Sequence, residues 1–201
     1  MKKSKFIIIA LLSISIISLE MSWTRIFSSE FFYTYAFLVL SLAIAGLGLG
    51  ALALRIFPKL NGDHWLGLSL SLTGLMALIS PSAVMHLGLD FASVFNSWAM
   101  IGKLAISIFL LGSAFFFGGI ALAKLFRNNH SEMPSLYMAD LTGAGIGVAV
   151  SILLMNSFGT PTAVFMSSLP VLVAAFIACR NRQKIVPIVF LIILIAMGIN
   201  A

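Results

Sequence analysis

The chain has 201 residues, of which 61% are hydrophobic and 9% are charged. Soluble globular domains carry about 25% charged residues, so this composition excludes an ordinary soluble domain and indicates an integral membrane protein. The 12 lysines and arginines outnumber the 6 acidic residues. They lie in clusters between apolar segments, which is typical of orientation in a membrane and not of nucleic-acid binding.

Seven apolar segments divide the chain when their ends are set at charged residues, prolines and polar clusters. A membrane-spanning helix needs about 20 residues, and most of the segments approach or exceed that length. They lie at residues 6–27, 32–56, 65–86, 98–122, 135–157, 161–179 and 185–200. No alternation of the kind found in barrel strands dominates them, so we predict an all-α, polytopic transmembrane helix bundle that forms a single domain over residues 1–201. Pro170 lies inside the sixth segment and predicts a kink there.

The basic residues fall on alternate sides of the predicted helices. They are Lys2, Lys3 and Lys5, then Arg55 and Lys59, then Lys124 and Arg127, then Arg180, Arg182 and Lys184. Basic residues stay on the cytoplasmic side of membrane proteins, so this pattern predicts a cytoplasmic N-terminus. Seven spans then place the C-terminus outside, in a multi-pass protein of the plasma (cytoplasmic) membrane, the inner membrane of a bacterium.

The first segment carries an acidic residue within its apolar sequence. The run from Phe6 to Leu19 is too short to cross a bilayer alone, so Glu20 lies inside the membrane if this segment spans it. Glu20, Trp23 and Arg25 occupy positions where a cleaved signal peptide would have small residues, so we predict an uncleaved helix. The indole of Trp23 and the guanidinium of Arg25 suit an anchor at the outer interface.

Glu20 and Lys103 are both expected inside the membrane, where an ionisable side chain costs at least about 2.5–3.5 kcal/mol unless it is paired or functional. Each lies about five residues, or about 7 Å, from the outer surface. We therefore hypothesise an ion pair between the first and fourth helices. Arg25 is a poorer partner for Glu20, because residues five apart do not share a helix face. The alternative is that Lys103 extends outward to the surface and Glu20 is protonated against a backbone carbonyl.

The fifth segment carries the third of these ionisable residues. Tyr137, Asp140 and Gly143 are spaced three residues apart and are expected on one helix face. Two interpretations remain open for Asp140: a structural pair with Arg55 or Lys124, or a role in binding a substrate or an ion.

Two pairs of glycines have the spacing of helix-packing motifs. Gly46 and Gly50 lie in the second segment, and Gly143 and Gly147 lie in the fifth. Small residues four apart let a neighbouring helix backbone approach closely, so we predict that both pairs pack against other helices.

No catalytic residue, metal site or cofactor site is predicted. His86 has no second ligand at a suitable spacing, and neither a phosphate-binding glycine loop nor a Ser-His-Asp or HExxH arrangement can be assembled. We do not expect this chain to be an enzyme by itself.

Four motifs together resemble the membrane domain of the spermidine synthase-like (polyamine aminopropyltransferase-like) membrane proteins. They are Glu20-x-x-Trp23-Thr24-Arg25, Gly46-Leu-Gly-Leu-Gly50, Phe116-Phe117-Gly118-Gly119 and Leu136-Tyr137-x-x-Asp140-x-x-Gly143-Ala144-x-x-Gly147. In that family the helices are commonly joined to a Rossmann-like aminopropyltransferase domain. The glycine-rich nucleotide site of such a domain, which would hold decarboxylated adenosylmethionine, is not found in this sequence. The resemblance implies a polyamine-related context.

Two functions are therefore expected. The first is a membrane subunit that anchors a cytoplasmic partner, aminopropyltransferase-like or other, or handles a small amine. The alternative is a compact secondary transporter, working alone or as a homo-oligomer, in which Glu20, Asp140 and Tyr137 bind a small cationic solute or relay protons. A purely structural assembly factor is a further alternative.

Overall fold

The computed structural model describes residues 2–30, 34–62, 64–89 and 97–179, and among these residues it contains helices and no strand. The helices are α1 (Lys2–Glu30), α2 (Thr34–Ile56), η1 (Pro58–Asn61), α3 (His64–His86), α4 (Trp98–Asn128), η3 (His130–Glu132), α5 (Met133–Phe158), α6 (Thr160–Met166) and α7 (Leu169–Ala178). The predicted all-α fold is confirmed, and six stretches of these helices are long and apolar enough to cross a membrane. The predicted seventh segment, 185–200, lies outside the described residues.

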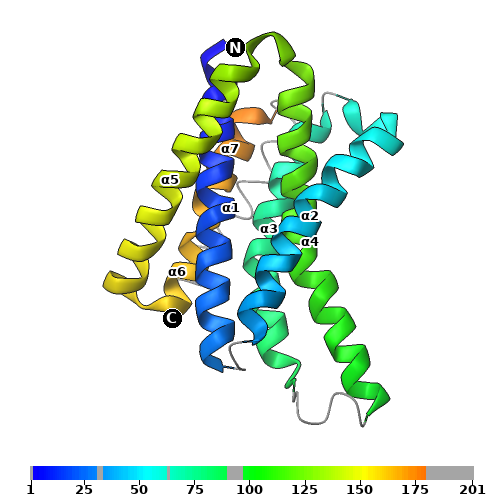
Figure 1. Cartoon of the computed structure of the whole chain (residues 1–201), viewed down its shortest axis with the longest axis vertical. Helices are drawn as coiled ribbons and strands as arrows, with labels where there is room; N and C mark the ends of the chain where they lie inside the picture. Colours follow the sequence, from blue (N-terminus) through cyan, green and yellow to red (C-terminus); the bar gives the residue numbers. More distant parts are fainter. Residues whose placement is uncertain (1, 31–33, 63, 90–96, 180–201) are drawn as a thin grey trace.

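The first helix lies in the middle of the bundle. α5 packs along one side of α1 and α2 along the other, with α6 and α7 also against it (Figure 1). The apolar part of a helix surface is stable only when other helices or lipid cover it. Ile9, Leu12, Leu19 and Phe27 of α1 are accordingly fully or almost fully buried.

Glycines set the distance between the two most extensively packed helix pairs, α1 with α5 and α2 with α4. A Cβ atom added at Gly143 would lie 2.5 Å from the carbonyl oxygen of Ala10, and one at Gly147 would lie 2.8 Å from that of Ile14. A Cβ atom at Gly46 would lie 2.7 Å from the Cβ of Phe115. Added at Gly50, it would meet the backbone of Phe116 and Ile120. The structure thus places all four predicted glycines where helices touch.

The sixth predicted segment is a single membrane-length stretch, Thr160–Ala178, with an interruption in the middle. α6 ends at Met166 and α7 begins at Leu169, with Pro170 in the first turn of α7. The predicted kink therefore takes the form of a two-residue break, Ser167 and Ser168, which ends one residue before Pro170. The proline has no amide proton for the helix ladder.

The outward surfaces of α2, α4 and α5 are apolar. Ile44 of α2 is 68% exposed, Phe109 of α4 is 74% exposed and Leu153 of α5 is 64% exposed. Exposed large apolar side chains on several helices fit contact with the acyl chains of a bilayer.

Candidate functional site

A groove of about 700 Å³ runs along α1 near Glu30. We call this end of the bundle the Glu30 end and the opposite end, where α1 begins, the Lys5 end. α1 forms the floor of the groove, and α2, α5 and α6 supply its walls. Its polar side chains are Glu20, Thr24, Arg25 and Ser28 from α1, Asn156 from α5 and Thr160 from α6.

Helical periodicity explains why this stretch of α1 has a polar side. Glu20, Thr24 and Ser28 follow one another at intervals of four residues and so share one helix face. Trp23 and Phe27 occupy a neighbouring face that is fully buried in the bundle. The apolar face of α1 therefore packs into the core while its polar face lines the groove.

The carboxylate of Glu20 is partly buried in this groove. No lysine, arginine or histidine side chain that the structure describes forms an ion pair with it. Arg25 lines the same groove and is exposed. The site therefore contains a carboxylate and a guanidinium that are both accessible to a bound molecule.

The predicted ion pair between Glu20 and Lys103 is not formed. Lys103 Nζ instead lies 3.4 Å from the carbonyl oxygen of Gly88. Trp23 of α1 contacts Phe115 of α4, which fixes the relative depth of the two helices. From that contact Lys103 lies twelve residues toward the Glu30 end and Glu20 three residues toward the Lys5 end, which separates their Cα levels by about 20 Å.

Counting inward from Arg25 and Trp98 gave the wrong relative depth for Glu20 and Lys103. The reason is that α4 begins at a different level in the bundle from the level at which α1 ends. α4 is tilted and continues past the Glu30 end of α1 (Figure 1). Residues that are equally far from their own helix ends are therefore not at equal depth in this bundle.

Trp23 is not the interfacial anchor that the sequence predicts. Its side chain is fully buried, and its ring meets that of Phe115 edge to face, with the centroids 5.4 Å apart and the planes at 76°. Arg25 follows two residues later, about 200° around the helix, and is exposed. The indole and the guanidinium therefore lie on opposite sides of α1.

Asp140 lies outside the groove and has a different partner from those expected. Ser13 Oγ of α1 donates a hydrogen bond to Asp140 Oδ1. Arg55 is exposed, and Lys124 Nζ is buried and donates to the carbonyl oxygen of Gly62. Asp140 therefore joins α1 to α5 as a hydrogen-bond acceptor.

Tyr137, Asp140 and Gly143 differ in their surroundings, although the sequence predicts that they share one helix face. Tyr137 is 56% exposed on the outside of the bundle, Asp140 is partly buried and Gly143 is buried against Ala10. The structure therefore brings Glu20 and Arg25 together in the groove, but neither Tyr137 nor Asp140 joins them.

Sequence reasoning missed a group of buried serines on α1. Ser18 Oγ donates to the carbonyl oxygen of Gly147 over 3.0 Å, and Ser15 Oγ donates to that of Ser167 in the break before α7. Ser22 Oγ lies 3.3 Å from Ser167 Oγ. The detectable signal is the spacing of Ser15, Ser18 and Ser22, which puts three hydroxyls on one side of an apolar helix where they can bind neighbouring helices.

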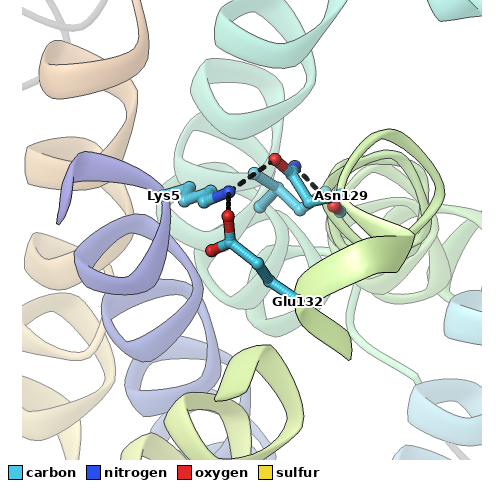
Figure 2. Close-up of polar contacts among 4 residues, drawn as sticks. Lys5, Asn129 and Glu132 are labelled. Carbon is cyan, nitrogen blue, oxygen red and sulfur yellow. Dashed lines mark hydrogen bonds and ion pairs between the residues drawn. The ribbon is translucent and has the colours of Figure 1, made fainter. Parts of the chain in front are cut away.

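A second polar cluster closes the Lys5 end of the bundle. Lys5 Nζ lies 3.0 Å from Glu132 Oε1 and donates to Asn129 Oδ1 over 2.9 Å, while Asn129 Nδ2 donates to the carbonyl oxygen of Leu125 (Figure 2). The ion pair and hydrogen bonds of this cluster connect the start of α1 with the turn between α4 and α5. Its hydrogen-bonding groups are used within the protein, so it is a structural clamp.

Among the described residues, no three His, Cys, Asp or Glu side chains gather where they could hold a metal ion. Comparisons with protein-family models, curated proteins and solved structures find no match to this chain. The function is therefore inferred from the groove around Glu20 and from the chemistry of its side chains.

Proposed function

We propose that this chain is a transporter-like membrane protein that binds an amine-bearing molecule, with the carboxylate of Glu20 as the counterion of the ammonium group. The observation that carries the proposal is the position of Glu20 in the groove, without a cationic partner among the described side chains. Ionisable residues inside membrane segments are costly, and they usually face a cavity in which they bind substrates or ions.

The dimensions and lining of the groove support a small ligand. Its volume of about 700 Å³ lies within the range of small-molecule sites, which is about 300–1,000 Å³. The hydroxyls of Thr24 and Thr160 and the amide of Asn156 can accept hydrogen bonds from an ammonium group. Phe37 and Met155 offer apolar surface to methylene groups.

The interrupted helix also favours this function. Transporters commonly form their substrate sites beside helices that are broken within the membrane. α6, which begins at Thr160 on the groove wall, ends at the break at Ser167. Small changes at this break can alter the position of Thr160 relative to Glu20.

Ligand-dependent thermal unfolding tests the proposal. We expect ethanolamine to stabilise the purified wild-type protein, by about 2.7 kcal/mol at a concentration one hundred times the Kd. Glu20→Gln removes the charge while retaining the shape of the side chain, so the stabilisation should be lost. Glu30→Gln is the matched control, because Glu30 is an exposed acid on the same helix and does not line the groove. Equal stabilisation of wild type and Glu20→Gln would contradict the proposal.

A second function is favoured by the surface at the Lys5 end. Arg55, Phe57 and Lys59, at and after the end of α2, are all exposed. We infer that this basic and aromatic turn can bind an acidic surface of a cytoplasmic partner, as the resemblance to spermidine synthase-like proteins implies. Purification after cross-linking should then recover one soluble protein in stoichiometric amount, and Arg55→Glu combined with Lys59→Glu should remove it. Recovery that does not depend on these two residues would count against this role.

A further inference from the structure

Among the described helices, the groove around Glu20 opens on a side of the bundle that carries exposed apolar residues. α2 and α5 lie on opposite sides of α1 (Figure 1), and the groove lies between them. Its rim carries Phe37, Leu40 and Ile152, whose side chains are 65%, 42% and 45% exposed. These exposed apolar residues belong to the surface expected to contact acyl chains, so a molecule in the bilayer has direct access to the groove.

The charged residues of the groove match a ligand with two opposite charges. Glu20 and Arg25 both line it, and their Cα atoms differ in level by about 7.5 Å along α1. An ammonium group satisfies the carboxylate, but a second ammonium group would face the Arg25 guanidinium. An anionic group on the same molecule satisfies Arg25 instead, and guanidinium groups bind phosphate especially well through paired hydrogen bonds.

We propose that the groove binds the headgroup of an aminophospholipid such as phosphatidylethanolamine. The phosphate lies at Arg25, nearer the membrane surface, and the ammonium group points down the groove to Glu20. Thr24 and Ser28 supply hydroxyls along the same polar face, while the acyl chains remain in the bilayer beside Leu40 and Ile152. This inference rests on the proposed function, because it names the class of amine that Glu20 binds.

Nanodiscs of defined composition provide the test. The wild-type protein is placed in three bilayers: phosphatidylcholine alone, phosphatidylcholine with about 20% phosphatidylethanolamine, and phosphatidylcholine with about 20% phosphatidylglycerol. At this content the added lipid is in large excess over one binding site per chain. The thermal midpoint and the lipid retained on release into the mass spectrometer are measured. We expect about one retained phosphatidylethanolamine per chain and a raised midpoint only in the mixture that contains this lipid, by mass action.

Headgroup chemistry and variants separate specific binding from general effects of the bilayer. Phosphatidylcholine has no N–H donor for the carboxylate, and phosphatidylglycerol has no ammonium group. Glu20→Gln and Arg25→Gln should each abolish the preference for phosphatidylethanolamine, whereas Glu30→Gln should retain it. Should Arg25→Gln fail to fold, Arg25→Lys tests the same contact, because it retains the charge and loses the paired hydrogen bonds.

The outcomes distinguish this inference from the proposed function. If ethanolamine stabilises the protein through Glu20 but phosphatidylethanolamine does not, the amine site stands and the lipid headgroup is excluded. If phosphatidylethanolamine acts equally on wild type, Glu20→Gln and Arg25→Gln, the headgroup binds elsewhere and the inference is overturned. If neither compound acts through Glu20, both the lipid inference and the amine site are wrong.

Discussion

Single side chains of α1 make the polar contacts that connect it with later helices. Ser13 Oγ donates to Asp140, and it lies 2.9 Å from the carbonyl oxygen of Ile9 in its own helix. Ser18 reaches the backbone of α5 at Gly147. Interhelical hydrogen bonds of this kind contribute about 0.6 kcal/mol on average and up to about 1.7 kcal/mol in membranes. Asp140 is thus best explained as part of the helix contact.

A double-mutant cycle can measure the contact between Ser13 and Asp140. Ser13→Ala and Asp140→Ala should each destabilise the protein, and the double variant should be more stable than the sum of the two losses predicts. We expect a coupling free energy of about 0.6–1.7 kcal/mol from unfolding in detergent or bicelles. The control cycle combines Asp140→Ala with Ser29→Ala, because Ser29 is exposed and its hydroxyl donates to the carbonyl oxygen of Ile26 in its own helix. A coupling no larger than that of the control would show that the hydrogen bond contributes nothing to stability.

The sequence identified some groove residues but not the directions in which side chains point. Glu20 and Arg25 are conspicuous because charges are rare within apolar segments. Trp23 was misplaced because an indole suits both a membrane interface and a core, and only the contact with Phe115 decides between them. The contribution of Asn156 was not predictable, because it depends on α5 packing beside α1.

At the scale of helices, glycine position matters more than glycine number. α5 packs against α1 through Gly143 and Gly147, whereas a Cβ atom at Gly145 would meet nothing within 4 Å. Gly145 lies on the outward side of the same helix. α5 therefore provides a comparison between buried and exposed glycines in one element.

Gly143→Ala and Gly145→Ala should change stability in different directions. The methyl group at residue 143 would press on the backbone of Ala10, and overpacking of this kind costs about 1–3 kcal/mol. The same change at residue 145 should be neutral or stabilise the helix by up to about 1 kcal/mol, because alanine favours helix more than glycine does. Thermal unfolding of the two variants in one detergent measures the difference. Equal effects would show that α1 and α5 do not pack as closely as described.

The helices themselves were predictable because length and hydropathy are local properties. α4 begins at Trp98 as predicted and continues to Asn128, six residues past the predicted end, because Lys124 is accommodated within the bundle. The break at Ser167 was only partly predictable. Pro170 indicates a kink, but the extent of the break also depends on Ser15 of α1, which bonds the Ser167 carbonyl oxygen.

At the scale of the whole molecule, the basic residues determine the expected orientation. Lys5, Lys124 and Arg127 all lie at the Lys5 end with the start of α1, and the exposed Arg55 and Lys59 lie near the end of α2. The positive-inside rule therefore predicts that this end faces the cytoplasm. The Glu20 groove would then open to the outer leaflet.

Accessibility of introduced cysteines tests this orientation. In a Cys179→Ser background, Ser29→Cys should react with a membrane-impermeant maleimide on intact cells, because Ser29 is exposed at the Glu30 end. Ser131→Cys, exposed in the turn between α4 and α5, should react only after the membrane is opened. The reverse pattern would place the groove in the cytoplasmic leaflet. Labelling of both sites in intact cells would mean that the membranes were not sealed, which labelling of a cytoplasmic marker protein would reveal. A denatured sample gives the maximum labelling of each site.

Relative helix depth was the main property of the whole molecule that the sequence did not contain. Hydropathy locates each helix along the chain, but it does not give the tilt of a helix or how far it extends past its neighbours. The separation of Glu20 from Lys103 follows from the tilt and extension of α4 (Figure 1). Depth in a bundle must therefore be measured from contacts such as Trp23 with Phe115.

The buried serines of α1 bond to residues that the ribosome makes much later. Ser18 bonds a carbonyl 129 residues later in the chain, and Ser15 bonds one 152 residues later. At a translation rate of about 5–20 residues per second, α1 resides in the membrane for about 8–30 s before Ser167 is made. During that interval the hydroxyls of Ser15 and Ser22 lack their partner at Ser167, whereas Ser18 can bond as soon as Gly147 is made. A nascent chain that stalls before α6 therefore has the contacts of Ser13 and Ser18 with α5 but lacks those of Ser15 and Ser22 with Ser167.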